Sequence, residues 1–112
     1  MAREFIITKT FEKNWSGLGL NDEDLRKLQN HILSNPFSGG IIEGAGGLVK
    51  LRWKLPNVGK SGVIPTLYVD FIRHETAVFV SCYAKSAKDT LTDKEKAEYK
   101  QLIKAIRKGL SQ

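Results

Sequence analysis

The chain has 112 residues, 41% hydrophobic and 27% charged, a balance typical of one small globular domain. A single cysteine, Cys82, and two histidines, His31 and His74, exclude an internal disulfide framework and a four-ligand Cys/His zinc site. No apolar run approaches the roughly 18 residues that span a bilayer, and the start of the chain is unlike a secretory signal. We therefore expect a cytoplasmic single domain over residues 1–112, with no metal, no cofactor and no membrane contact.

The first half of the sequence predicts a strand followed by two helices. Phe5–Thr8 is β-prone, and a short helical stretch then runs over Thr10–Trp15. Asn21 can cap a second helix, with Asp24 three residues further on. The apolar residues of this helix recur with helical spacing, at Leu25, Leu28, Ile32 and Leu33. Asn35–Pro36 ends the helix, because the residue before a proline is disfavoured in the helical conformation.

The second half predicts strands over 48–55, 66–72 and 77–83, and the short polar connection 73–76 makes the last two an antiparallel hairpin. Thr92 and Glu95 form a capping box that opens a final helix. The apolar stripe of this helix comprises Tyr99, Leu102, Ile103, Ile106 and Leu110, and another face carries Lys96, Lys100, Lys104 and Lys108. We therefore expect an α+β fold, in which an antiparallel sheet of three to five strands packs against N-terminal helices and a C-terminal helix. One face of the sheet should remain open for a ligand.

Positive charge gathers in the second half of the chain. Of 18 basic and 12 acidic residues, residues 1–44 hold five and six, residues 45–85 six and two, and residues 86–112 seven and four. In the predicted strand 48–55, Lys50, Arg52 and Lys54 alternate with apolar residues and so emerge from one face. A nucleic acid suits such a surface, because each neutralised phosphate releases condensed counterions. Solubility alone also explains a net charge of +6.

Other candidate motifs have simpler interpretations. Gly59–Ser61 lacks the upstream glycine of a phosphate-binding loop, and the glycines of 44–47 lack the spacing of a dinucleotide fingerprint. The two histidines are ordinary boundary residues, and Trp15 and Trp53 are core residues rather than stacking platforms. Cys82 fits a small buried side chain better than a nucleophile.

The chain resembles the RelE/HigB superfamily of bacterial type II toxins, and it looks closest to the HigB-like branch. The resemblance runs nearly end to end. Its most specific segment is residues 42–53, and a Gly-Lys-Ser-Gly loop (59–62), Leu67–Phe71 and Tyr83–Lys85 follow in family order. The resemblance implies a microbial-RNase-like α+β fold and cleavage of mRNA, usually in the ribosomal A site. RNA carries its own nucleophile, the ribose 2′-OH, so such an enzyme needs no metal but only positioning, proton transfer and charge stabilisation.

Site residues follow from the resemblance by position. Lys50 and Arg52 match the two basic strand residues, with phosphate binding and transition-state stabilisation as their roles and Lys50 as the general-base candidate. Lys85 matches the basic residue after the last strand, and Tyr83 is a candidate for stacking or proton transfer. These four are the expected catalytic residues. The expected contacts to RNA or ribosome are Lys54, Lys60, Tyr68, Arg73 and Lys88. For Tyr68, which matches a strand tyrosine of the family, packing is the alternative to base stacking.

Two departures keep alternatives open. Members of the family commonly have an arginine three residues before the strand tyrosine and a second base after the strand-end lysine; here these positions are Pro65 and Ser86. The alternatives are a ParE-like toxin that inhibits DNA gyrase and an inactive RNA-binding relative. The expected partners are mRNA on the ribosome and a cognate antitoxin, a HigA-like helix-turn-helix protein through which alone the toxin would meet operator DNA.

Overall fold

The computed structural model describes residues 3–36, 38–54, 62–84 and 90–111. The elements follow in the order β1 (Glu4–Ile7), α1 (Lys9–Gly17), α2 (Asp22–Ser34), β2 (Gly40–Ile41), β3 (Val49–Lys54), β4 (Val63–Phe71), the 3-10 turn η2 (Ile72–His74), β5 (Thr76–Cys82) and α3 (Asp93–Leu110). The described strands form one five-stranded sheet in the order β1-β5-β4-β3-β2. The expected α+β class is confirmed.

Three of the four strand pairings are antiparallel, as expected, but β1 pairs with β5 in parallel, with Phe5 opposite Ala77 and Ile7 opposite Phe79. A parallel pairing needs a long crossover between the two strands, and here nearly the whole chain from α1 to η2 provides it. Two local contacts fasten the start of β1. The Glu4 N–H donates to the Glu75 carbonyl at 2.7 Å, and the Arg3 guanidinium binds the Asp70 carboxylate at 2.8 Å. The edge strand is therefore tied to both β5 and β4.

The helices begin where the sequence places their caps. Asn21 and Asp24 form a reciprocal capping box at α2, and Thr92 and Glu95 form another at α3. The α1 helix is longer than expected, because the Thr8 side chain caps it by accepting from the Phe11 N–H. These caps satisfy backbone donors that would otherwise have no partner within the helix.

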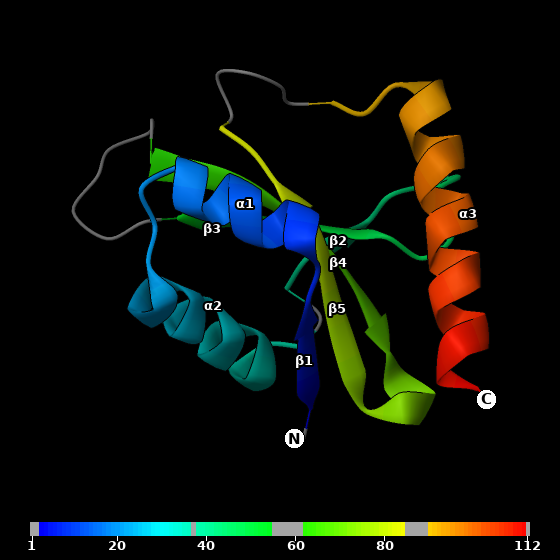
Figure 1. The fold of residues 1–112 in the computed structure, drawn as a ribbon, viewed down its shortest axis with the longest axis horizontal. Helices are drawn as coiled ribbons and strands as arrows, with labels where there is room; N and C mark the ends of the chain where they lie inside the picture. Colours follow the sequence, from blue (N-terminus) through cyan, green and yellow to red (C-terminus); the bar gives the residue numbers. More distant parts are fainter. Residues whose placement is uncertain (1–2, 37, 55–61, 85–89, 112) are drawn as a thin grey trace.

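Helices cover both faces of the sheet (Figure 1), with α1 and α2 on one side and α3 on the other. The first core lies under α1 and α2 and includes Phe11, Trp15, Leu28, Tyr68 and Phe79. The second core lies under α3 and includes Leu48, Leu67, Val69, Val78 and Ile103. The expectation of one open sheet face is therefore wrong over β4 and β5, because apolar side chains on both faces of these strands must be shielded from water.

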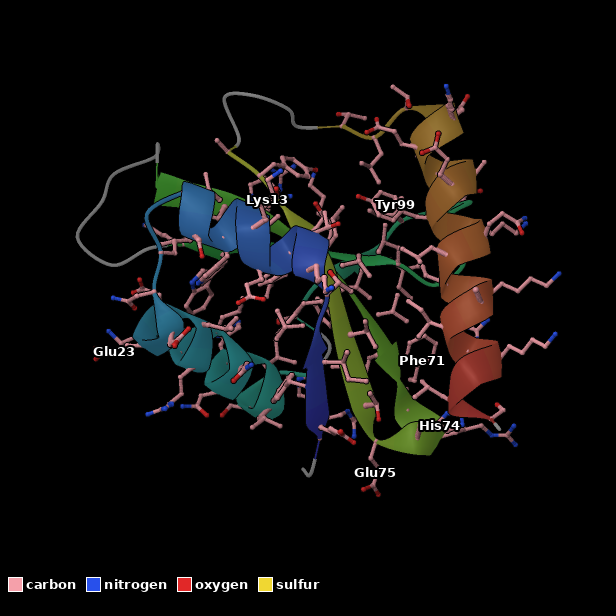
Figure 2. All side chains as sticks on the ribbon, in the orientation of Figure 1. Lys13, Glu23, Phe71, His74, Glu75 and Tyr99 are labelled. Atoms are coloured by element: carbon pink, nitrogen blue, oxygen red, sulfur yellow. The ribbon has the colours of Figure 1, made fainter. Side chains whose placement is uncertain are left out.

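The α3 helix meets the sheet through side chains of its inner face. In Figure 2, Tyr99 and Phe71 lie between α3 and the sheet. Ile103 is fully buried in the second core, and Tyr99, Ile106 and Leu110 pack against that core. The prediction that Leu102 belongs to the same apolar stripe is wrong, because its side chain is 43% exposed. The Arg107 guanidinium lies 5.5 Å from the centre of the Phe71 ring, which is within the range of a cation–π contact.

Candidate functional site: a basic hollow between β3 and α3

The basic residues of β3 point to the α3 side of the sheet. Val49, Leu51 and Trp53 pack into the first core, under α1 and α2. Successive side chains of a strand point to opposite faces, so Lys50 and Arg52 lie on the face that α3 covers. The register agrees, because Lys50 pairs with Leu67, and Leu67 belongs to the second core. The structure therefore brings Lys50 and Arg52 together on one face, with Lys54 exposed at the end of the same strand.

Two hollows meet at these side chains. The first, of about 170 Å³, opens between β3 and the beginning of α3 and is lined by Ile42, Lys50, Arg52, Thr90, Leu91 and Lys96. The second, of about 420 Å³, extends from the same strand toward β2 and is lined by Ser38, Gly40, Ile41, Ile42, Lys50, Leu51 and Arg52. Lys50 and Arg52 line both, so they stand between the two hollows.

Lys96 is a site residue that the sequence did not distinguish. It belongs to a basic stripe of α3 whose four lysines look equivalent in the sequence. In the structure Lys96 is half-buried and lines the smaller hollow with Lys50 and Arg52, whereas Lys100, Lys104 and Lys108 are exposed. The sequence shows that Lys96 lies in the first turns of a helix that begins after Thr92. It does not show that Lys96 lines a hollow, because this depends on how α3 packs against the sheet.

Tyr83 lies two strands away from Arg52 on the same side of the sheet. It is half-buried against the second core, and its N–H donates to the Pro65 carbonyl at 3.2 Å. Pro65 in turn pairs with Arg52 across β3 and β4. Because neighbouring strands are about 4.8 Å apart, Tyr83 begins about 10 Å from Arg52 at the backbone. The fully buried Pro65 ring separates the two residues.

Two expected RNA contacts do not reach this site. Tyr68 is 1% exposed and packs edge-on against Phe79 in the first core, so its ring has no face left for a base. Of the two roles expected for Tyr68, its burial in the first core favours packing over base stacking. Arg73 is exposed in η2, six residues beyond Leu67, and this separation along β4 corresponds to about 20 Å. The structure thus does not bring Arg73 to the basic hollow.

Three of the expected site residues, Lys60, Lys85 and Lys88, lie outside the described residues.

The remaining polar candidates are Cys82 and the two histidines, and none of them lines the basic hollow. Burial raises the pKa of the Cys82 thiol to about 12, so the thiol is protonated and unreactive near neutral pH. His31 packs against Trp53 with ring centres 5.2 Å apart, on the first-core side, and His74 lies in η2. In the described part of the chain no three His, Cys, Asp or Glu side chains gather as a metal site would require. The described helices include none with the length and apolarity to cross a membrane.

The family profile of the RelE toxin of the RelE/RelB toxin–antitoxin system matches residues 4–111. The chain belongs to the RelE toxin family. A toxin of a toxin–antitoxin system implies an antitoxin partner, and the match extends over nearly the whole domain that carries the basic hollow.

The fold is shared with a solved member of this family. The structure of the E. coli toxin RelE, a double arginine-to-alanine mutant in the free state, superposes with a TM-score of 0.57 at 17% sequence identity. The alignment covers 79% of this chain and 88% of the E. coli protein. At this identity the likeness shows the common fold of RelE toxins, and the roles of individual side chains rest on the geometry of the hollow.

Proposed function

We propose that this RelE-family toxin is a metal-independent endoribonuclease that cleaves mRNA on the ribosome and so arrests translation and growth. The observation that carries the proposal is the placement of Lys50 and Arg52 on one face of β3, both lining the same two hollows. Had one side chain pointed into the first core, the pair could not act on one phosphate. Because translation takes place in the cytoplasm, the proposal places the toxin there.

The proposed reaction uses the nucleophile that RNA contains. The ribose 2′-oxygen attacks the adjacent phosphorus as its proton passes to a base, the P–O5′ bond breaks, and the departing 5′-oxygen takes up a proton. The products are a 2′,3′-cyclic phosphate and a free 5′-hydroxyl. Negative charge builds on the nonbridging phosphate oxygens in the transition state, and cationic donors held in place stabilise it there. Lys50 and Arg52 are the donors that the hollow supplies, and Lys54 extends the cationic strand face.

The proposed reaction also needs one group that takes up the 2′-OH proton and one that donates a proton to the 5′-oxygen. Lys50 is the proposed base, since it lines both hollows beside Arg52. As a base, its amine takes the 2′-OH proton and so becomes the ammonium that stabilises the phosphate oxygens. Tyr83, on the same sheet side with Pro65 between it and Arg52, is the proposed donor to the 5′-oxygen or a stacking partner for a base. We retain Lys85 as a catalytic residue, and Lys60 and Lys88 as RNA or ribosome contacts, on the family pattern in the sequence alone. Arg73 is kept only as a ribosome contact remote from the hollow.

The test is to induce the toxin and map mRNA 5′ ends on a translated message and on the same message without a start codon. Cuts confined to the translated message support ribosome-dependent cleavage. Cuts in both messages contradict ribosome dependence but leave the nuclease proposal intact. DNA breaks with intact mRNA would favour gyrase inhibition, and absence of toxicity would favour an inactive relative.

Variants of the two central cations sharpen this test. We expect Lys50→Ala and Arg52→Ala each to lower cleavage by about 100-fold or more, because loss of one transition-state donor typically costs 10²–10³ in rate. Both proteins should remain folded, since Lys50 and Arg52 are not among the buried core residues. Lys27→Ala, an exposed lysine on α2, is the matched control and should cleave at the wild-type rate. If both variants stay fully toxic, the assignment of these residues is wrong.

We also propose that the cognate antitoxin is a HigA-like helix-turn-helix protein, so that the toxin meets operator DNA only through it. The HigB-like pattern of residues 42–53 supports this choice. Co-expression with the product of the adjacent gene tests it. A stable complex that binds operator DNA, while the toxin alone does not, is the expected result.

A further inference from the structure

The hollow beside β3 has a wall that comes from α3. Thr90, Leu91 and Lys96 close it on the side opposite Lys50 and Arg52, and Ile42 lies between them. Three cationic side chains from two elements far apart in the sequence therefore border one space of about 170 Å³. Cationic donors that converge on one concave space from two elements suit an anion whose oxygens accept several hydrogen bonds at once.

The position of Lys96 is fixed by how α3 docks. The Thr92–Glu95 capping box sets the first turn of α3 and hence the direction in which residue 96 leaves the helix. One turn later the backbone of Lys100 packs against Gly46, where a Cβ atom would lie only 3.1 Å from the Lys100 Cα. Ile103 anchors the next turn in the second core. Lys96 is thus held between a capped helix start and two packed turns.

The partial burial of Lys96 separates it from the other lysines of its stripe. Lys104 and Lys108 continue along the same face of α3, but their side chains are exposed to water. A lysine stem can pack along a surface while its charged end stays near water, so a half-buried Lys96 that lines the hollow can present its ammonium to a ligand there. The geometry points to a phosphate as that ligand, since phosphate oxygens accept hydrogen bonds from several cations at once.

We propose that Lys96 is a third phosphate-binding residue, which grips the RNA backbone from the α3 side while Lys50 and Arg52 grip it from β3. This proposal rests on the proposed function and goes beyond it, because it makes the C-terminal helix a structural part of the RNA site. Lys96 binds substrate oxygens and exchanges no proton. Its loss should therefore weaken RNA binding and raise KM more than it lowers kcat.

The test uses the full-length protein and a short single-stranded RNA with 2′-O-methyl groups, which binds but has no nucleophile. Fluorescence anisotropy gives the Kd for the wild type, Lys96→Ala, Lys96→Arg and the matched control Lys104→Ala. We expect Lys96→Ala to weaken binding about tenfold, and the slope of log K against log salt to become shallower by about 0.7, the value for one phosphate on a single strand. Lys96→Arg should restore both quantities, and Lys104→Ala should differ from the wild type by no more than about twofold.

The outcomes separate the two proposals. If Lys96→Ala binds like Lys104→Ala while the wild type binds and cleaves RNA, the role of Lys96 is overturned and the proposed nuclease stands. If the wild type binds the oligonucleotide but never cleaves mRNA, the proposal of nuclease activity is wrong. The proposed Lys96 contact then stands if the salt slope of Lys96→Ala is shallower than that of the wild type, and it is wrong if the two slopes are equal. If the wild type binds no RNA, both proposals fail. Circular dichroism and the melting temperature of Lys96→Ala check that a loss of binding does not come from unfolding.

Discussion

Two weakly acidic side chains, Cys82 and Tyr68, are buried in the first core. Burial raises the pKa of Cys82 from 9.0 to about 12, because the thiolate would be poorly solvated there. Burial also raises the pKa of Tyr68, and the nearby Asp70 charge adds to the effect. In both cases the fold favours the neutral form. The stabilisation is fully present below the pKa of the unfolded chain and is lost as pH rises toward the pKa of the folded one.

The decrease of the free energy of unfolding at alkaline pH should therefore depend on the ionisation of Cys82. Above pH 9, the wild type should lose free energy of unfolding at about 1.4 kcal/mol per pH unit relative to Cys82→Ala, which has no thiol to ionise. Urea unfolding of both proteins between about pH 8 and pH 10.5 measures this difference. Subtracting the variant cancels the titration of lysines and tyrosines that both proteins share. Parallel curves over this range would contradict the burial of an ionisable thiol.

At the residue scale, the sequence could predict which side chains of β3 share one face of the sheet, but it could not do so for β4. In β3, apolar and basic residues alternate, so the period of two identifies Lys50 and Arg52 as neighbours on one side. Most of β4 is buried on both faces, with no polar alternation to show where Tyr68 points. A buried central strand reads as a nearly continuous apolar run. Without that pattern, the sequence leaves both packing and base stacking open for Tyr68.

At the element scale, local signals predicted the elements and missed how they meet. Asn21 and Thr92 marked the beginnings of two helices because capping is decided within four residues. The parallel pairing of β1 with β5, and the docking of α3 over the second core, depend on contacts between distant segments. No local spacing encodes those contacts, so Lys96 could be placed on a helix but not in the site.

Gly46 lies in the turn before β3, and at this residue the turn packs against α3. Its φ of +72° is one that side chains other than glycine rarely adopt, and a Cβ atom there would press on the Lys100 backbone. Gly44 has a similar φ of +81° but faces open space. Both substitutions to alanine should carry the left-handed backbone cost of about 1 kcal/mol. We expect Gly46→Ala to lose about 1–3 kcal/mol more in the free energy of unfolding, as overpacking does.

The pair Gly44→Ala and Gly46→Ala isolates this packing term, because the backbone strain is nearly the same in both. Chemical denaturation of the two variants gives the difference directly. The same proteins should differ in RNA affinity if Gly46→Ala tilts α3 and withdraws Lys96. Equal stabilities would show that α3 does not rest on this glycine.

At the scale of the whole molecule, the sheet separates two surfaces of different charge. The side covered by α3 carries Lys50, Arg52 and the lysine stripe of α3, while α2 on the other side begins with Asp22, Glu23 and Asp24. The total charge of +6 does not describe this arrangement. A polyanion approaching in solution responds to the field around the molecule, so RNA should be drawn toward the α3 side.

Two double variants with the same net charge test whether RNA association depends on where the charges lie or only on the net charge of the protein. Lys104→Glu with Lys108→Glu lowers the net charge of the protein by 4, from +6 to +2, through changes on α3, and Arg26→Glu with Lys27→Glu lowers it equally through changes on α2. All four residues are exposed, so neither variant removes a core contact. Lys104 and Lys108 lie about 12 and 18 Å along the helix from Lys96, which is within the Debye length of about 30 Å at 0.01 M salt.

Stopped-flow association with the 2′-O-methyl RNA measures the effect. At about 0.01 M salt the α3 variant should associate about tenfold more slowly than the wild type, and the α2 variant should slow much less. At about 1 M salt the Debye length falls to about 3 Å, so the three association rates should converge. Equal slowing of both variants at low salt would mean that net charge alone governs the encounter. Slowing confined to α3 would mean that the placement of charge around the basic hollow steers the RNA.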